Sequence, residues 1–143
     1  MPKKKYSASV EDYLEAIHEI IAKKQAVRAK DIAAWLGVSN PSVSGALKHI
    51  ANLGLINYVP YDVITLTPLG EKTAHEVIKK HATLTAFFTD LLALSPEEAD
   101  EEACKVEHVI SGKLLQRLIG ILDHVKNDPT FSKCVNRLHQ KFS

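Results

Sequence analysis

The sequence is poor in cysteine and in long apolar runs, and its charges almost cancel. Its two cysteines, Cys104 and Cys134, are too few for the disulfide framework of a small secreted domain. No apolar stretch approaches the roughly 18 residues that a membrane-spanning helix needs, and the first residues lack the pattern of a signal peptide. No glycine-rich loop of the phosphate-binding kind is present either. We therefore expect a cytoplasmic protein with no membrane partner.

The opposite charges are separated along the chain, although the net charge is only +1. Between Ile20 and Tyr61 there are five lysines and arginines and a single acid, Asp31, whereas five of the six residues from Glu97 to Glu102 are acidic. A basic half and an acidic cluster predict one anionic and one cationic partner. The chain has 143 residues, 45% of them hydrophobic, which is enough for one domain or two small ones with a buried core.

Two short helices joined by a tight turn are predicted in the basic half. A helix over residues 29–36 carries Trp35, which we expect in the core, and ends at a glycine. A second helix begins at a Ser39 or Asn40 cap, has proline in its first turn and ends by Gly54. This arrangement is typical of a helix-turn-helix, and the alternative is an ordinary helical hairpin.

A β-hairpin is predicted directly after the second helix, from strands at residues 55–59 and 63–67. A hairpin at this place is typical of the wing of a winged-helix domain, whose second helix lies in the DNA major groove. Small hydroxyls and lysines on such a helix reach phosphates and base edges, and a basic arm at the N-terminus adds charge. The candidate DNA-binding residues are Lys3, Lys4, Lys5, Arg28, Lys30, Ser39, Asn40, Pro41, Ser42, Ser44, Lys48 and Tyr61.

Three side chains that can bind metal follow one another closely in the acidic half. A Ser-Pro-Glu-Glu capping box at residues 95–98 begins a helix that we expect to continue toward Val125. Helical spacing then places Cys104, Glu107 and His108 on one face, where a thiolate, a carboxylate and an imidazole can bind one divalent transition-metal ion. The alternative is a half-buried cysteine beside two surface polar residues.

Two carboxylates in the first predicted helix form a further candidate pair. Ser9 can cap a helix that runs to about Lys23, and Asp12 and Glu15 lie three residues apart on one of its faces. Carboxylates are favourable in the first turns of a helix, and Asp12 is at the capping-box position relative to Ser9. Spacing alone therefore favours a helix-stabilising role over metal binding, but leaves both open.

Five segments, spread in register over residues 9 to about 125, together resemble the DtxR/MntR family of metal-dependent transcriptional repressors. They are Val10-Glu-Asp-Tyr-Leu-Glu-Ala-Ile, Asp31-Ile-Ala with Leu36-Gly-Val-Ser-Asn-Pro-Ser-Val-Ser, Leu66-Thr-Pro-Leu-Gly, Lys80-His81, and Glu102-Ala-Cys-Lys-Val-Glu-His-Val-Ile-Ser. The resemblance implies a mainly α fold. A winged helix-turn-helix with a small β-hairpin wing is expected over residues 1–74, and an all-helical metal-binding and dimerisation domain over residues 75–143. The chain resembles the two-domain, manganese-regulator-like form without an SH3-like domain.

The same resemblance implies a set of metal ligands that departs from both branches of the family. The implied ligands are Asp12, Glu15, His81, Cys104, Glu107 and His108. The iron-responsive branch has Met in place of Asp12, and the manganese branch has Glu in place of Cys104. Thr85 and Asp100 replace two ligands of the diphtheria-type second site, which argues against a complete second site. Asp62 at the wing tip replaces a usual Arg and should weaken a phosphate contact.

The expected function is metal-dependent binding of a homodimer to a palindromic double-stranded DNA operator. The resemblance implies repression of metal-uptake genes when Mn²⁺ or Fe²⁺ is plentiful, and we expect Zn²⁺, Co²⁺ or Ni²⁺ to substitute in vitro. Carboxylate ligands favour Mn²⁺, whereas the thiolate of Cys104 favours Fe²⁺. The rival functions are a winged-helix regulator that senses oxidation through Cys104 and a metal-dependent hydrolase. Because half the chain reads as a DNA-binding domain, little room remains for a substrate pocket, and no enzyme is expected.

Overall fold

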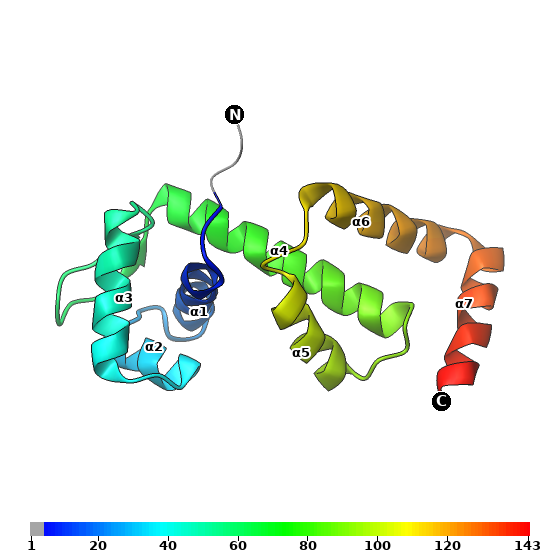
Figure 1. Cartoon of the computed structure of the whole chain (residues 1–143), viewed down its shortest axis with the longest axis horizontal. Helices are drawn as coiled ribbons and strands as arrows, with labels where there is room; N and C mark the ends of the chain where they lie inside the picture. The colour runs from blue at the N-terminus through cyan, green and yellow to red at the C-terminus, as the bar shows by residue number, and fades with distance from the viewer. Residues whose placement is uncertain (1–4) are drawn as a thin grey trace. The chain divides into compact units, whose positions relative to one another are not determined.

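The computed structural model describes residues 5–143, so the candidate DNA-binding residues Lys3 and Lys4 lie outside the described residues. The chain divides into two compact units, Met1–Val77 and Ile78–Ser143. Its elements in chain order are α1 Ala8–Lys24, α2 Ala29–Leu36, α3 Asn40–Asn52, β1 Ile56–Asn57, β2 Thr65–Leu66, α4 Pro68–Asp90, α5 Pro96–Val106, α6 Gly112–Asn127 and α7 Pro129–Phe142 (Figure 1). None of the helices in the described part of the chain has the length and apolar character to cross a membrane.

Helix α1 begins earlier than the sequence indicated. The N-cap is Ser7, whose hydroxyl accepts a hydrogen bond from the backbone N–H of Val10 at 3.2 Å. The predicted Ser9 cap is therefore wrong, because the serine two residues earlier has the extended backbone that a cap needs. With the helix start moved to Ala8, Asp12 falls in the second turn and loses its capping-box position. The capping explanation for this carboxylate does not hold.

Helices α2 and α3 form the predicted helix-turn-helix with the predicted limits. Gly37 ends α2 in the left-handed conformation at φ +67°, which glycine adopts without a steric penalty. Ser39 caps α3 by accepting a hydrogen bond from the N–H of Ser42, and proline occupies the first turn. Caps and turn chemistry thus determine both helices locally, before any packing is considered.

The wing is shorter than predicted but has the expected antiparallel pairing. Only two residues on each side form the ladder, with Ile56 opposite Leu66 and Asn57 opposite Thr65. Beyond it, the N–H of Ile64 donates to the carbonyl of Val27 at 2.8 Å, so the second arm of the hairpin is joined to the segment before α2. The wing is therefore fixed to the helix-turn-helix at its base.

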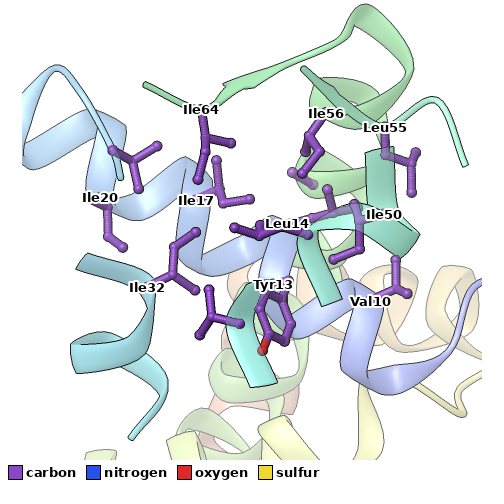
Figure 2. Close-up of a cluster of buried hydrophobic side chains, with 14 residues drawn as sticks. Val10, Tyr13, Leu14, Ile17, Ile20, Ile32, Ile50, Leu55, Ile56 and Ile64 are labelled. Carbon is purple, nitrogen blue, oxygen red and sulfur yellow. The ribbon is translucent and has the colours of Figure 1, made fainter. Parts of the chain in front are cut away.

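One hydrophobic core holds the first unit together. Its apolar side chains come from α1, α2, α3 and both arms of the hairpin, and Figure 2 shows them converging on Leu14 and Ile17 of α1. The labelled members are Val10, Tyr13, Leu14, Ile17, Ile20, Ile32, Ile50, Leu55, Ile56 and Ile64. The prediction that Trp35 lies in this core is wrong: the residue is 46% exposed, and the ammonium of Lys23 lies 4.7 Å from the centroid of its ring. The cation stacked on the ring accounts for an indole that stays at the surface.

Helix α4 begins against the hairpin through a close backbone contact at Gly70. Thr67 caps the helix by accepting a hydrogen bond from the N–H of Gly70 and donates its hydroxyl to the carbonyl of Gly54. A β-carbon placed on Gly70 would overlap the carbonyl oxygen of Leu55 and lie 2.8 Å from its carbonyl carbon. Only a glycine allows the helix to approach the loop this closely.

The stability of the first unit should depend on pH through Asp31. Its carboxylate accepts a hydrogen bond from the backbone N–H of Arg28 at 2.9 Å, and this bond, aided by the ammonium of Lys24, holds the pKa of Asp31 below its ordinary value of 3.8. Because the pKa of this carboxyl group is lower in the folded chain than in the unfolded chain, the ionised carboxylate stabilises the fold at pH values above the unfolded-state pKa. This stabilisation is lost as the pH falls through the folded-state pKa. Asp31→Asn should cost about 1 kcal/mol or less at neutral pH and nothing in strong acid. Urea unfolding followed by fluorescence of Trp35 measures this, and a deficit that persists unchanged in acid would contradict it.

The second unit consists of residues 78–90 of α4 together with α5, α6 and α7. Buried Leu84, Ala103, Ile110 and Leu115 form its core, and α7 follows the end of α6 at a steep angle and contacts it (Figure 1). The prediction of one helix from residue 95 toward Val125 is wrong. The chain turns after α5, where the N–H groups of Val109 and Ile110 both donate to the carbonyl of Val106, and Ser111 caps a new helix. Ile110 gains burial in the core through this turn.

Candidate metal centre and DNA-binding surface

A buried carboxylate lies between two imidazoles in the second unit. Glu107 is the C-cap residue of α5, and its side chain is only 1% exposed. One of its oxygens, Oε2, lies 2.6 Å from Nδ1 of His81 on α4, and the other, Oε1, lies 3.5 Å from Nε2 of His108. A carboxylate this deep in a protein is costly unless it is paired, and both of its oxygens have a nitrogen partner.

A thiol and a second carboxylate lie beside the same histidine. The sulfur of Cys104 is 3.9 Å from Nδ1 of His81, and Oδ1 of Asp100 is 2.7 Å from Nε2 on the opposite side of the ring. His81, Asp100 and Cys104 each offer a donor atom, and these atoms all lie within 4.8 Å of one another. Donor atoms around one transition-metal ion lie roughly 3–4 Å apart, given metal–ligand bonds of about 2.0–2.3 Å. Atoms within 4.8 Å of one another are close to this spacing, and the imidazole of His81 and the thiol of Cys104 suit a divalent transition-metal ion.

The structure brings together the four predicted ligands that lie in the second unit, His81, Cys104, Glu107 and His108. Cys104 lies on α5, whereas Glu107 and His108 follow the end of that helix. Glu107 keeps helical backbone angles and its N–H donates to the carbonyl of Ala103 at 2.9 Å, so the spacing from Cys104 to Glu107 is still that of a helical face. Asp12 and Glu15 lie on α1 in the first unit, three residues apart, and a part for them in metal binding stays a prediction.

Asp100 contacts the candidate ligand His81 but is not among the predicted ligands, since the family resemblance gives it only as a departure from the second site. It lies four residues before Cys104 on α5, so helical spacing alone puts both side chains on one face. That spacing was a usable signal. The contact of Asp100 with His81, however, joins two different helices and requires α5 to approach α4 at this point.

Three other acids of the cluster at the start of α5, Glu98, Glu101 and Glu102, have partners of their own. The Glu98 carboxylate completes the predicted capping box by accepting a hydrogen bond from the N–H of Ser95 at 2.9 Å. Lys105 pairs with Glu102 at 3.1 Å and Glu101 at 3.5 Å, and the hydrogen bond to Glu102 is the main reason that the pKa of Lys105 is raised. These acids therefore stabilise α5, and the candidate metal ligands lie elsewhere on it.

A basic cleft lies between α3 and the wing in the first unit. It has a volume of about 630 Å³, and cations from three places line it. Its lining residues are Arg28, Ala29, Lys30, Ser44, Lys48, Tyr58, Pro60, Tyr61 and Asp62. Five of the predicted DNA-binding residues, Arg28, Lys30, Ser44, Lys48 and Tyr61, thus share one surface. Ser39, Asn40, Pro41 and Ser42 form the exposed N-terminal turn of α3, and Lys5 is exposed before α1.

The wing tip is held in a defined position beside the helix-turn-helix. Nη1 of Arg28 donates to the backbone carbonyl of Tyr61 at 3.1 Å, and Tyr61 itself is 98% exposed. The carboxylate of Asp62 accepts a hydrogen bond from the N–H of Val63. The exposed phenol and the surrounding cations can contact the DNA backbone. The carboxylate of Asp62 is instead hydrogen-bonded within the turn of the wing.

A helix-turn-helix with an attached wing, and a second helical unit with clustered metal-ligand side chains, define a metal-responsive DNA-binding protein. Residues 5–64 match the family model of the iron dependent repressor N-terminal DNA binding domain, and residues 67–133 match that of the iron dependent repressor metal binding and dimerisation domain. The chain belongs to the DtxR/MntR family of metal-dependent transcriptional repressors, as the five segments predicted, and the fold class is confirmed.

Individual relatives agree with this assignment. An uncharacterized HTH-type transcriptional regulator of Methanocaldococcus jannaschii is 36% identical to this protein, and the alignment covers 85% of this chain and 98% of the length of the relative. Transcriptional regulator MntR of Salmonella typhimurium is 38% identical over 78% of this chain and 70% of its own. The solved structure of the manganese regulator SloR is similar with a TM-score of 0.72 at 30% identity, over 80% of this chain and 54% of that one. The chain therefore spans about half the length of that solved structure. None of these relatives supports the alternative of oxidation sensing through Cys104.

Proposed function

We propose that this protein represses metal-uptake genes as a homodimer when Mn²⁺ or Fe²⁺ binds the ligand group around Glu107. The observation that carries the proposal is the buried Glu107 carboxylate between the imidazoles of His81 and His108, with the thiol of Cys104 beside it. A buried acid with such neighbours, in a family of metal-dependent repressors, is best explained by a cation. We assign no catalytic role to any residue.

Asp12 and Glu15 complete the ligand set in this proposal. Two arguments support them: the capping explanation for Asp12 does not hold once α1 begins at Ala8, and the family resemblance places ligands at both positions. Donors from both units can hold the same ion only in one relative arrangement of the units. The free energy of metal binding then favours that arrangement, and 1.4 kcal/mol of coupling would raise DNA affinity about tenfold.

The DNA-binding part of the proposal rests on α3 and the basic cleft beside it. Helix α3 enters a major groove with Ser42, Ser44 and Lys48, while Arg28 and Lys30 contact phosphates. In a dimer two such helices read two half-sites of a palindrome about 34 Å apart. Because the operator is chromosomal DNA, the protein acts in the cytoplasm.

The choice of metal depends on the mixture of ligands. Asp12, Glu15 and Glu107 provide hard oxygen donors that suit Mn²⁺, whereas the sulfur of Cys104 suits Fe²⁺. We propose Mn²⁺ as the main corepressor and Fe²⁺ as the second. Zn²⁺, Co²⁺ and Ni²⁺ bind nitrogen and sulfur donors more tightly in general, so they can substitute in vitro.

DNA affinity measured against free Mn²⁺, Fe²⁺ and Zn²⁺ tests the proposal. Fluorescence anisotropy with operator DNA, selected from a random pool in the presence of Mn²⁺, should show tighter binding as each metal is added. Asp12→Ala and His108→Ala should each abolish the metal dependence while the circular dichroism spectrum stays unchanged. Asp123→Ala, which removes an exposed carboxylate on α6, is the charge-matched control and should respond to metal like the parent. Retention of the full metal response by both ligand variants would refute the proposal.

A further inference from the structure

The ring of His81 has two different sides. Its Nδ1 faces the buried oxygen of Glu107 and the sulfur of Cys104, at 2.6 Å and 3.9 Å. Its Nε2 faces one oxygen of Asp100 at 2.7 Å. Both nitrogens therefore have a close partner, but only the Nδ1 side has both a carboxylate oxygen and a sulfur beside it.

Exposure separates the two carboxylates further. Glu107 is 1% exposed, whereas the side chain of Asp100 is 66% exposed. A cation on the Nδ1 side would have nitrogen, oxygen and sulfur donors around it, with the Glu107 carboxylate buried and the Cys104 thiol exposed. Near Asp100 the same cation would have much of its surroundings filled by solvent. The buried side of the ring is thus the better metal side.

We propose that Asp100 is a positioning residue for the metal centre, which accepts the Nε2–H of His81 and so keeps Nδ1 directed at Glu107 and Cys104. The inference rests on the proposed metal-binding function and adds a residue to it. A metal-bound histidine commonly donates its second ring N–H to a carboxylate, which fixes both the ring orientation and the tautomer. Asp100 is held on α5 one turn before Cys104, so the helix that supplies the thiol also orients the imidazole.

The expected effect is on metal affinity rather than on stoichiometry. Loss of such a partner typically weakens metal binding by tenfold to a hundredfold. Since water reaches most of the Asp100 side chain and can replace part of the contact, we expect Asp100→Ala to weaken Mn²⁺ binding about tenfold. Asp100→Asn keeps an acceptor oxygen and should lose less. The number of ions bound per chain should be the same in all three proteins.

Titration calorimetry of the full chain with Mn²⁺ provides the first readout, without DNA. Glu101→Ala is the matched control, because it removes the neighbouring exposed acid of the same helix, whose partner is Lys105 rather than His81. It should bind Mn²⁺ like the parent. Nitrogen-15 spectra of the histidine rings in the Zn²⁺-loaded protein provide the second readout. They should show Nδ1 of His81 ligated and Nε2 protonated.

Three results would overturn the role of Asp100. They are an unchanged Mn²⁺ affinity in Asp100→Ala, ligation of Zn²⁺ through Nε2 of His81, and the loss of one bound ion per chain in both Asp100→Ala and Asp100→Asn. The last result would make Asp100 a ligand instead. Failure of the proposed function looks different. It would appear as the parent chain binding no metal, which removes the basis of both proposals, or as metal binding with no change in DNA affinity, which leaves the assignment of Asp100 intact.

Discussion

Replacement of Glu107 by glutamine is expected to lower Mn²⁺ affinity by more than a hundredfold and to remove the metal dependence of DNA binding. The glutamine side chain has nearly the same size, so packing in the second unit is preserved. It lacks the negative charge, and it puts an amide where both imidazoles now meet a carboxylate oxygen. An outer partner of a metal ligand accounts for a tenfold to hundredfold effect, and the central acid of the group should exceed it. Calorimetric titration with Mn²⁺ and anisotropy with operator DNA measure the two effects.

Glu102→Gln is the matched control for this substitution. Glu102 lies on α5, is exposed and pairs with Lys105 at 3.1 Å. The same chemical change there should leave Mn²⁺ affinity and DNA binding within experimental error of the parent, because surface ion pairs contribute little. Equal effects at the two positions would mean that negative charge in general, and not the buried carboxylate, attracts the metal. That outcome would contradict the site proposed around Glu107.

Gly70→Ala should destabilise the first unit by about 3 kcal/mol or more. The added methyl group would overlap the backbone carbonyl of Leu55, and backbone atoms cannot move aside as the end of a flexible side chain can. Overpacking typically costs 1–3 kcal/mol, and a clash with main chain belongs at the upper end of this range. The clash also disturbs the carbonyl of Leu55, which accepts a hydrogen bond from the N–H of Thr67 at the start of α4. Urea unfolding followed by fluorescence of Trp35 reports on this unit, because the chain has a single tryptophan.

Gly45→Ala provides the control for the glycine substitution. Gly45 lies within α3, and a β-carbon there would have no other heavy atom within 4 Å. Alanine in a helix is favoured over glycine by about 1 kcal/mol, so this variant should be as stable as the parent or slightly more so. If Gly70→Ala unfolds at the same urea concentration as Gly45→Ala, the close approach of α4 to the hairpin does not limit the choice of residue 70.

The parts of the fold that were predictable are those that local chemistry determines. Gly37 marks the end of α2 as predicted, and Ser39, one of the two caps predicted for α3, marks its start, because a cap needs only its own neighbours. The cap of α1 was predicted at Ser9 but lies at Ser7, whose backbone is extended as a cap requires. Trp35 was misplaced because apolar character predicts burial on average and does not anticipate a lysine stacked on the ring.

The candidate site was predictable in composition and not in geometry. Cys104, Glu107 and His108 could be proposed from their helical spacing, but the turn that ends α5 and leaves Ile110 buried in the core could not. Such a turn results from packing in the second unit, which helix propensity does not describe. The contact between His81 and Asp100 joins residues 19 positions apart on two helices. No local pattern encodes such a contact.

The end of α5 at Val106 also has an electrostatic consequence for the candidate site. Aligned peptide dipoles give the C-terminal end of a helix a partial negative charge of about half an electron. Because α5 stops immediately before Glu107, this partial charge lies next to Glu107 and His108. If α5 continued as a single helix toward residue 125, its C-terminal partial charge would lie far from Glu107 and His108. The backbone of α5 thus adds about 0.3–1 kcal/mol of attraction for a cation there, without contributing a ligand.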